Sequence, residues 1–265
     1  MNILKDKIPE LYSMKSYPSQ LFYDGNLELL KSTKVSIIGT RKPSQYSRNL
    51  TGQLSSSLSR NGVCIVSGAA MGIDATAHNG AGPANTIAVL PCGVDVKYPA
   101  VNKKLLTDIQ NSGLLLSQFD LGFRATPWSF VVRNELVVAL GDVLVVGEAE
   151  LNSGSMRSIE FALKMGKEIF VFPHRLGESS ATSTLLKEGK AKAIYDLDEF
   201  VSKFATIENT GVKVNGDEPL TKEDKFIEFC KTNPTYEEAL KKYPQRIFEA
   251  ELSGEIEVKN AKIFV

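Results

Sequence analysis

Long apolar runs, paired cysteines and an excess of charge of either sign are all missing from this sequence. Its 265 residues hold 31 Lys and Arg against 31 Asp and Glu, so a polyanionic partner would need a local basic patch. The three cysteines show no CxxC spacing, which favours reduced structural thiols over disulfides or a metal site. No stretch approaches the roughly 20 apolar residues of a membrane span. Residues 1–17 are charged and lack the apolar run of a signal peptide, so we expect a cytoplasmic protein without a membrane partner.

The common nucleotide fingerprints are also missing. No GxGxxG follows the first predicted strand, and GxxxxGK[ST] occurs nowhere, which disfavours NAD binding and P-loop hydrolysis. Asp74 and His78 lie four residues apart, but no oriented catalytic triad can be argued from that spacing. We therefore expect no cofactor, no metal, no catalytic residues and no enzymatic activity.

Short apolar runs alternate with helical patterns from residue 34 onward. The runs predict strands at 35–38, 63–66, 86–90, 114–116, 143–146 and 168–172, with a possible edge strand at 194–195. The helical patterns cover 45–60, 72–78, 102–110, 128–140, 155–165 and 182–187. Because the strands are continuously apolar, both faces of the sheet should be covered. This pattern predicts an α/β fold with a mostly parallel, doubly wound sheet, whose ligands bind at the carboxyl ends of the strands.

The regions outside this alternation set the domain boundaries. Residues 1–33 are weakly patterned, and we expect them to pack on the main domain, 34–205. Residues 206–220 have few apolar positions and predict a linker. Residues 221–265 predict three helices (222–230, one opening at 235–238, and 245–252) and a terminal hairpin, the plan of a winged-helix domain. Its eight Lys and Arg against nine Asp and Glu favour protein contacts over DNA binding.

The turn after the first predicted strand is a candidate anion site. Gly39 ends the strand, and Thr40, Arg41 and Lys42 precede a helix. Free backbone amides and the positive end of a helix dipole favour anions at such a place. Arg41 adds a planar guanidinium suited to phosphate. A tight turn with solvated cations would show the same residues, so the turn alone leaves both interpretations open.

A second candidate lies on the helix predicted at 128–140. Phe130, Arg133 and Asn134 are three and four residues apart, so one helix face brings them together. An aromatic ring beside a guanidinium and an amide can stack a base and hold its backbone. A core Phe with a surface Arg would explain the same pattern.

Two further loops leave strand ends on the same predicted side of the sheet. Ser67 and Gly68, with Gly72, allow close backbone approach before a helix, although any such turn favours glycine. Residues Ser153, Gly154 and Ser155 offer hydroxyls that can cap a helix or bind phosphate oxygens.

Together, these loops resemble the DNA-processing protein A family (DprA, also called Smf) over about 17–200, with a looser match at 221–265. The resemblance is carried by Val35-Ser-Ile-Ile-Gly-Thr-Arg-Lys-Pro-Ser44, Ile65-Val-Ser-Gly-Ala-Ala-Met-Gly-Ile-Asp74, Thr86-Ile-Ala-Val-Leu90 leading to Tyr98-Pro99, Phe130-Val-Val-Arg-Asn134, Ser153-Gly-Ser155 and Leu185-Leu-Lys-Glu-Gly-Lys-Ala191. It implies an extended Rossmann-like domain that binds single-stranded DNA and forms a homodimer. It also implies that the protein receives incoming single strands in natural transformation, protects them and helps load the recombinase RecA.

The resemblance also implies roles for individual residues. Gly39, Thr40, Arg41 and Lys42 would hold phosphate, and Phe130 would stack a base beside Arg133 and Asn134. The other DNA-binding residues would be Ser67, Gly68, Gly72, Ser153, Gly154, Ser155 and Lys187. Glu135 departs from the family, which often has Arg there, and would weaken the basic patch. The alternative is a small-nucleotide enzyme resembling nucleoside monophosphate phosphoribohydrolases, with Glu160 as its acid.

Overall fold

The computed structural model describes residues 2–204 and, further along the chain, 225–230, 232, 234–243, 256–259 and 262–264. The chain divides into two compact units, Met1–Asn209 and Thr210–Val265. The predicted linker at 206–220 and the predicted third helix at 245–252 lie outside the described residues.

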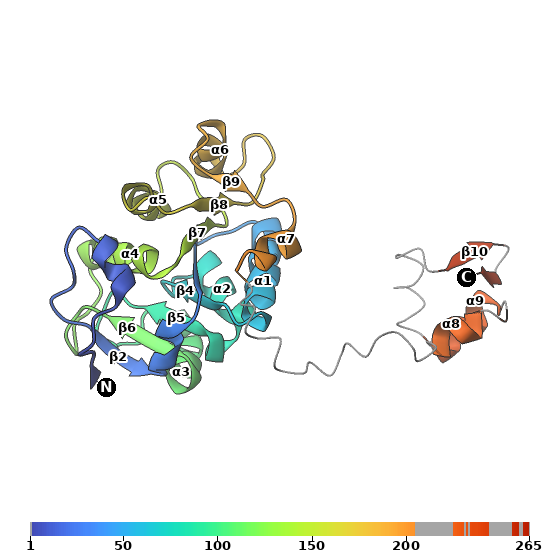
Figure 1. The fold of residues 1–265 in the computed structure, drawn as a ribbon, viewed down its shortest axis with the longest axis horizontal. Helices are drawn as coiled ribbons and strands as arrows, with labels where there is room; N and C mark the ends of the chain where they lie inside the picture. Colours follow the sequence, from blue (N-terminus) through green and yellow to red (C-terminus); the bar gives the residue numbers. More distant parts are fainter. Residues whose placement is uncertain are drawn as a thin grey trace. The chain divides into compact units, whose positions relative to one another are not determined.

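One nine-stranded sheet forms the centre of the first unit (Figure 1). In spatial order its strands are β1 (Asn2–Ile3), β2 (Phe22–Gly25), β6 (Leu114–Ser117), β5 (Thr86–Val89), β4 (Cys64–Ser67), β3 (Lys34–Ile38), β7 (Val143–Val146), β8 (Ile169–Val171) and β9 (Lys192–Ala193). The strands from β6 through β9 pair in parallel, whereas β2 pairs antiparallel with β6 and with β1. The predicted α/β class and the mostly parallel, doubly wound sheet are confirmed.

The strand order reverses direction at β3. From β3 the chain builds outward through β4, β5 and β6, and then returns to place β7 on the other side of β3. Crossover helices therefore lie on both faces. These crossovers are α1 (Gln45–Arg60), α2 (Ile73–Ala81), α3 (Lys103–Ser112), α4 (Pro127–Leu140), α5 (Ser155–Lys164) and α6 (Ser180–Lys187), and α7 (Leu197–Ser202) follows β9.

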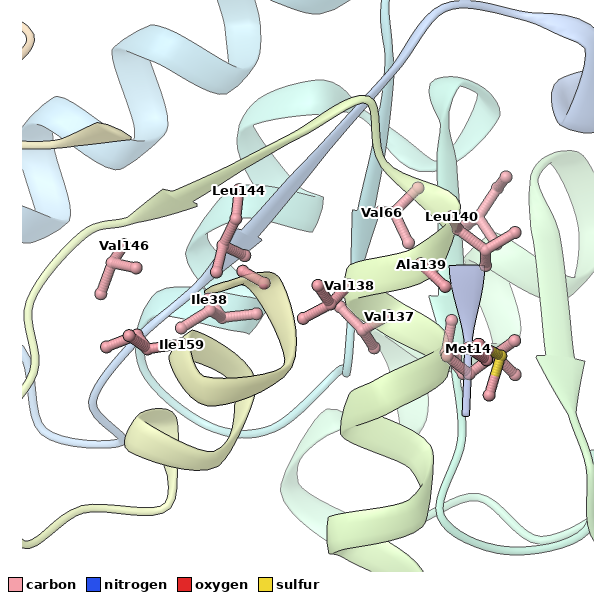
Figure 2. Close-up of a cluster of buried hydrophobic side chains, with 14 of the residues drawn as sticks. Met14, Ile38, Val66, Val137, Val138, Ala139, Leu140, Leu144, Val146 and Ile159 are labelled. Carbon is pink, nitrogen blue, oxygen red and sulfur yellow. The ribbon is translucent and has the colours of Figure 1, made fainter. Parts of the chain in front are cut away.

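Two apolar layers hold these helices to the sheet. One layer packs α4 and α5 against side chains such as Ile38, Leu144 and Val146 (Figure 2), and α6 belongs to the same layer. On the opposite face, α1, α2 and α7 pack against residues such as Ile37 and Val145, and α3 packs near the β5–β6 edge. Successive strand residues thus enter opposite cores, which explains why the strands are continuously apolar.

Short or irregular elements were missed by the sequence pattern. The two-residue strand β1 and the helix α7 were not predicted, and the last strand, β9, lies at 192–193 rather than 194–195. Asp196 caps α7 by accepting a hydrogen bond from the Glu199 amide, a contact that its Asp-x-x-Glu pattern could have indicated.

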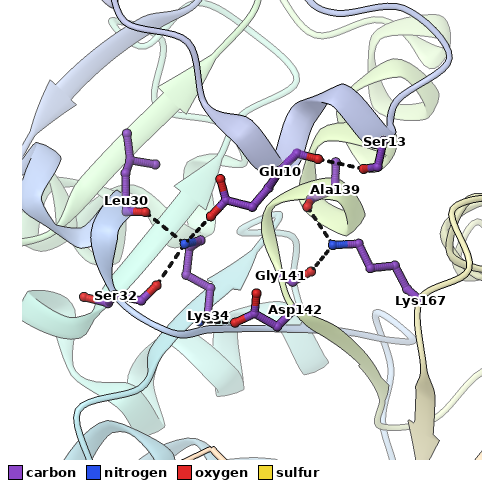
Figure 3. Close-up of polar contacts among 9 residues, drawn as sticks. All are labelled: Glu10, Ser13, Leu30, Ser32, Lys34, Ala139, Gly141, Asp142 and Lys167. Carbon is purple, nitrogen blue, oxygen red and sulfur yellow. Dashed lines mark hydrogen bonds and ion pairs between the residues drawn. The ribbon is translucent and has the colours of Figure 1, made fainter. Parts of the chain in front are cut away.

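A buried lysine ties the first 33 residues to the sheet. The Nζ atom of Lys34, 3% exposed, donates to the backbone oxygens of Leu30 and Ser32 at 2.9 and 2.8 Å (Figure 3). It also pairs with the Glu10 carboxylate at 2.7 Å. All three donors of the ammonium are used, so its burial is compensated. Near it, Lys167 donates to the backbone oxygens at the end of α4 (Figure 3).

The described part of the second unit holds two helices and a hairpin. They are α8 (Lys225–Cys230), α9 (Tyr236–Lys242), β10 (Glu257–Lys259) and β11 (Lys262–Phe264), and the two strands pair antiparallel. Thr235 and Glu238 form the predicted capping box of α9. The winged-helix plan itself stays a prediction, because its third helix is not described.

Candidate functional site

The loops after β3 and β7 diverge at the point where the strand order reverses. In open α/β sheets this divergence creates a crevice at the carboxyl ends of the strands. A cavity of about 700 Å³ lies there. Its walls come from the β3–α1 loop, the start of α2, one face of α4 and the start of α5.

Ten of the predicted site residues line this cavity. They are Gly39, Thr40, Arg41, Lys42, Phe130, Arg133, Asn134, Ser153, Gly154 and Ser155. The structure thus brings together residues that are more than 100 positions apart in the chain. Helical spacing on α4 aligns three of them, as expected.

Two guanidinium groups lie close to the Phe130 ring. The Cζ atom of Arg41 is 5.3 Å from the centre of the Phe130 ring, and that of Arg133 is 5.9 Å away. These distances lie within the range of cation–π attraction. An aromatic ring with two cations nearby can stack a base while the cations bind the phosphates of the strand.

Arg133 is buried yet poorly paired. Its side chain is 4% exposed, its Nη1 atom donates to the Val89 oxygen at a long 3.4 Å, and the Asp74 carboxylate is 3.9 Å away. Its Nε atom has no partner among the described residues. Burial lowers the pKa of Arg133 and raises that of Asp74, although each charge partly offsets the other's shift. Such an under-satisfied buried cation suits a site that gains hydrogen bonds from an anionic ligand.

Gly68 and Gly72, which were expected among the DNA-binding residues, shape this site without being part of its wall. A Cβ atom on Gly68 would lie 1.2 Å from the Arg133 Nη1 atom, so only glycine leaves room for the guanidinium. Gly72 has a φ of 82°, and a Cβ there would meet the Thr40 oxygen at 2.3 Å. Both glycines therefore position the residues that do line the cavity.

Ser67 and Lys187 also lie away from the cavity. Ser67 is fully buried at the end of β4, where its hydroxyl donates to the Ile37 oxygen at 2.6 Å. Lys187 is exposed at the last residue of α6 and is not part of the cavity wall. The expectation that these two residues contact a ligand in this cavity is not supported by their positions.

Sequence reasoning missed several residues of the wall. These are Ile38, Ala70, Asp74, Pro127, Val131, Val137, Arg157 and Ser158. Arg157 forms an exposed pair with Glu160 at 2.8 Å. Its place in the first turn of α5, directly after the Ser153–Ser155 loop, could have indicated it. With Arg157 included, the wall carries four cations and one acid, Asp74, although the whole chain has no net charge. Arg157 is the one of these cations that forms the exposed pair with Glu160.

The other candidate polar groups have structural partners. His78 is buried, and its Nδ1 atom lies 2.6 Å from the Thr86 hydroxyl. Burial lowers the pKa of His78 to about 3, so the ring stays neutral. Glu135 accepts a hydrogen bond from the Lys15 amide and does not line the cavity. Within the described residues, no group of His, Cys, Asp or Glu is arranged to hold a metal ion.

The fold and the cavity define a Rossmann-like α/β protein with a cationic, aromatic site at the switch point of its sheet. The family model described as DNA recombination-mediator protein A matches residues 2–205. The chain belongs to this family. Its relatives include DNA processing protein DprA of Streptococcus pneumoniae, 36% identical over 77% of this chain and 73% of that protein. Protein Smf of Escherichia coli is 33% identical over 68% of this chain and 50% of its own length.

Solved structures of the family share the fold. DNA processing protein A of Helicobacter pylori superposes with a TM-score of 0.75 at 40% identity, over 76% of this chain and 94% of that chain. That structure was solved to show how the Helicobacter pylori protein binds single-stranded DNA. DprA of Streptococcus pneumoniae gives a TM-score of 0.69 at 34% identity, over 76% of this chain and 71% of that chain. Among the described residues, no helix has the length and apolar character needed to cross a membrane.

Proposed function

We propose that this chain is a recombination mediator that binds single-stranded DNA in the switch-point cavity. The observation that carries the proposal is the Phe130 ring with the Arg41 and Arg133 guanidinium groups both within 6 Å of its centre (5.3 and 5.9 Å), in a wall with four cations and one acid. Single-strand binders combine stacking rings with a positive groove in this way. The family, and the DNA-binding relative from Helicobacter pylori, support the same function.

Each predicted contact has a physical role in this proposal. Phe130 stacks one base, and Arg41 turns from the ring to a phosphate oxygen when the base arrives. Lys42 and the Ser153 and Ser155 hydroxyls hold neighbouring phosphates. Arg133 gains the hydrogen bonds that it lacks in the free protein. In this proposal the chain binds DNA without transforming it, and Asp74, the acid of the wall, serves as the partner of Arg133.

The phosphoribohydrolase alternative is not favoured. The family is that of recombination mediators. Glu160, the acid which that alternative needs, is not part of the cavity wall and pairs with the wall residue Arg157. Incubation with nucleoside monophosphates should therefore release no free base.

The proposal also covers the oligomeric state, the protein partner and the cellular location. As a homodimer in the cytoplasm, the protein would protect single strands entering by natural transformation and help load RecA onto them. The C-terminal domain, with a linker at 206–220, would contact proteins rather than DNA. The extension draws its support for a role in recombination from the family's description as a recombination mediator. It is tested by measuring the solution mass and the lag before RecA hydrolyses ATP on covered strands.

A competition experiment tests the ligand class. Labelled oligo-dT is bound by the full chain and challenged with single strands, duplex, RNA and free nucleotides at two salt concentrations. We expect single-stranded DNA to compete best and the affinity to fall as salt rises, because phosphate contacts release counterions. Equal competition by duplex, or an affinity that does not respond to salt, would contradict the proposal.

A further inference from the structure

The cavity is too small to enclose a polynucleotide. Its volume of about 700 Å³ falls within the range of pockets that hold one small ligand, about 300–1,000 Å³. A strand that places one nucleotide there must continue over the rim. Its neighbouring bases need further surfaces to stack on, because single-strand sites normally span several nucleotides.

Tyr98 provides an aromatic surface next to this rim. It belongs to the loop that follows β5, and 42% of its surface is exposed. The centre of its ring lies 5.8 Å from that of Phe130, with the ring planes tilted by 63°. Tyr98 is not part of the cavity wall, so the aromatic surface that begins inside the cavity continues outside it.

The tilt between the two rings leaves ring surface open for base stacking. A tilted pair keeps more ring face open than a parallel stack, and Tyr98 remains substantially exposed despite the contact. Two adjacent bases of a splayed single strand can therefore each find a separate ring.

We propose that Tyr98 is a second stacking platform, which takes the base next to the one held at Phe130. This inference rests on the proposed function. The strand then leaves the cavity across the carboxyl ends of the strands, from β3 toward β5. Because every base has a π-face, the platform would extend the site without adding sequence specificity.

The test compares four full-length proteins: wild type, Tyr98→Ala, Tyr98→Phe and Tyr195→Ala. Tyr195 is the matched control, because it is an exposed tyrosine of the same unit that follows β9 at the other edge of the sheet. Each protein binds a labelled oligo-dT of about 16 nucleotides and a strand of equal length without bases. We expect Tyr98→Ala to weaken oligo-dT binding about five- to a hundredfold, the effect of one lost base stack.

The other arms separate stacking from indirect effects. Tyr98→Phe keeps the ring and should restore most of the affinity, and on the abasic strand Tyr98→Ala should bind like wild type. A Tyr98→Ala protein that matches Tyr195→Ala on oligo-dT would overturn the platform while leaving the proposed function intact. An equal loss on the abasic strand would also overturn it, because Tyr98 would then act by positioning the wall. If wild type does not bind oligo-dT, the proposed function fails and the platform fails with it.

Discussion

Lys34 and Arg133 are both buried cations, but their surroundings differ. Lys34 uses all three of its donors at 2.7 to 2.9 Å, on two backbone oxygens and the Glu10 carboxylate. Arg133 has one contact at 3.4 Å, one carboxylate at 3.9 Å and an Nε atom without a partner in the described part of the chain. A saturated cation stabilises the fold, whereas an under-satisfied one retains donors for a ligand. We therefore propose that Lys34 is a structural charge and Arg133 a binding charge.

The largest effect on stability should come from Lys34→Met, which keeps most of the side-chain volume. It leaves Glu10 and the Leu30 and Ser32 oxygens without their donor. We expect the free energy of unfolding to fall by about 3 kcal/mol, measured by urea denaturation. Oligo-dT affinity of the folded protein should not change. An unchanged free energy of unfolding in Lys34→Met would show that the three hydrogen-bonded contacts of Lys34 do not stabilise the fold.

The matched variant Arg133→Met should lose little stability but much DNA affinity. It removes few well-made contacts, so we expect unfolding to lose only about 1–2 kcal/mol. Oligo-dT affinity should fall about tenfold or more, because charge-assisted hydrogen bonds to phosphate contribute about 1.5–3 kcal/mol. Denaturation and anisotropy titration of the two Met variants test the comparison together. An Arg133→Met protein that binds oligo-dT as tightly as wild type would contradict the distinction between the two buried cations.

Asp74→Asn should change how stability depends on pH. Burial raises the pKa of Asp74 in the folded protein, although Arg133 and Arg41 oppose this. A raised folded pKa favours folding below the unfolded value of about 3.9, and that contribution is lost as pH rises through the folded value. We therefore expect the stability of wild type relative to Asp74→Asn to decline with rising pH from about 4. Urea denaturation across pH 4–8 measures this difference, and parallel profiles would contradict the assignment.

The smallest effect should come from Lys31→Ala. Lys31 pairs with Glu28 at 2.9 Å, but both side chains are more than 70% exposed. Exposed pairs contribute about 0–1 kcal/mol. We expect a change below about 0.5 kcal/mol in urea denaturation, which makes Lys31→Ala the exposed control for Lys34→Met. A loss comparable to that of Lys34→Met would show that burial does not distinguish the two lysines.

The sequence predicted the sheet well because its strands are continuous apolar runs bounded by glycine and polar turns. The helix at 45–60 has the predicted bounds, since Ser44 caps it and its apolar spacing is regular. The strands β1 and β9, of two residues each, carry too little periodicity to be predicted. Spacing on α4 correctly brought Phe130, Arg133 and Asn134 to one wall.

The remaining site residues depend on tertiary contacts that spacing does not encode. Ser67 follows an apolar strand, as a binding residue would, but its hydroxyl bonds to the neighbouring strand. Gly68 resembles a ligand loop, yet its lack of a side chain accommodates Arg133 from another helix. Asp74 has the pattern of a solvated helix acid, yet it is buried, with the Arg133 guanidinium of α4 at 3.9 Å.

Binding of a labelled oligo-dT to wild type, Phe130→Ala and Arg41→Glu tests the central claim most directly. We predict that Phe130→Ala weakens binding by about 1–3 kcal/mol. Arg41→Glu should also weaken binding, and its effect should be larger at low salt than at high salt, because salt screens the charge. Both proteins should remain folded, because neither side chain belongs to the buried apolar layers. Unchanged affinity in both variants would contradict the account, because the strand would then bind somewhere other than the switch-point cavity.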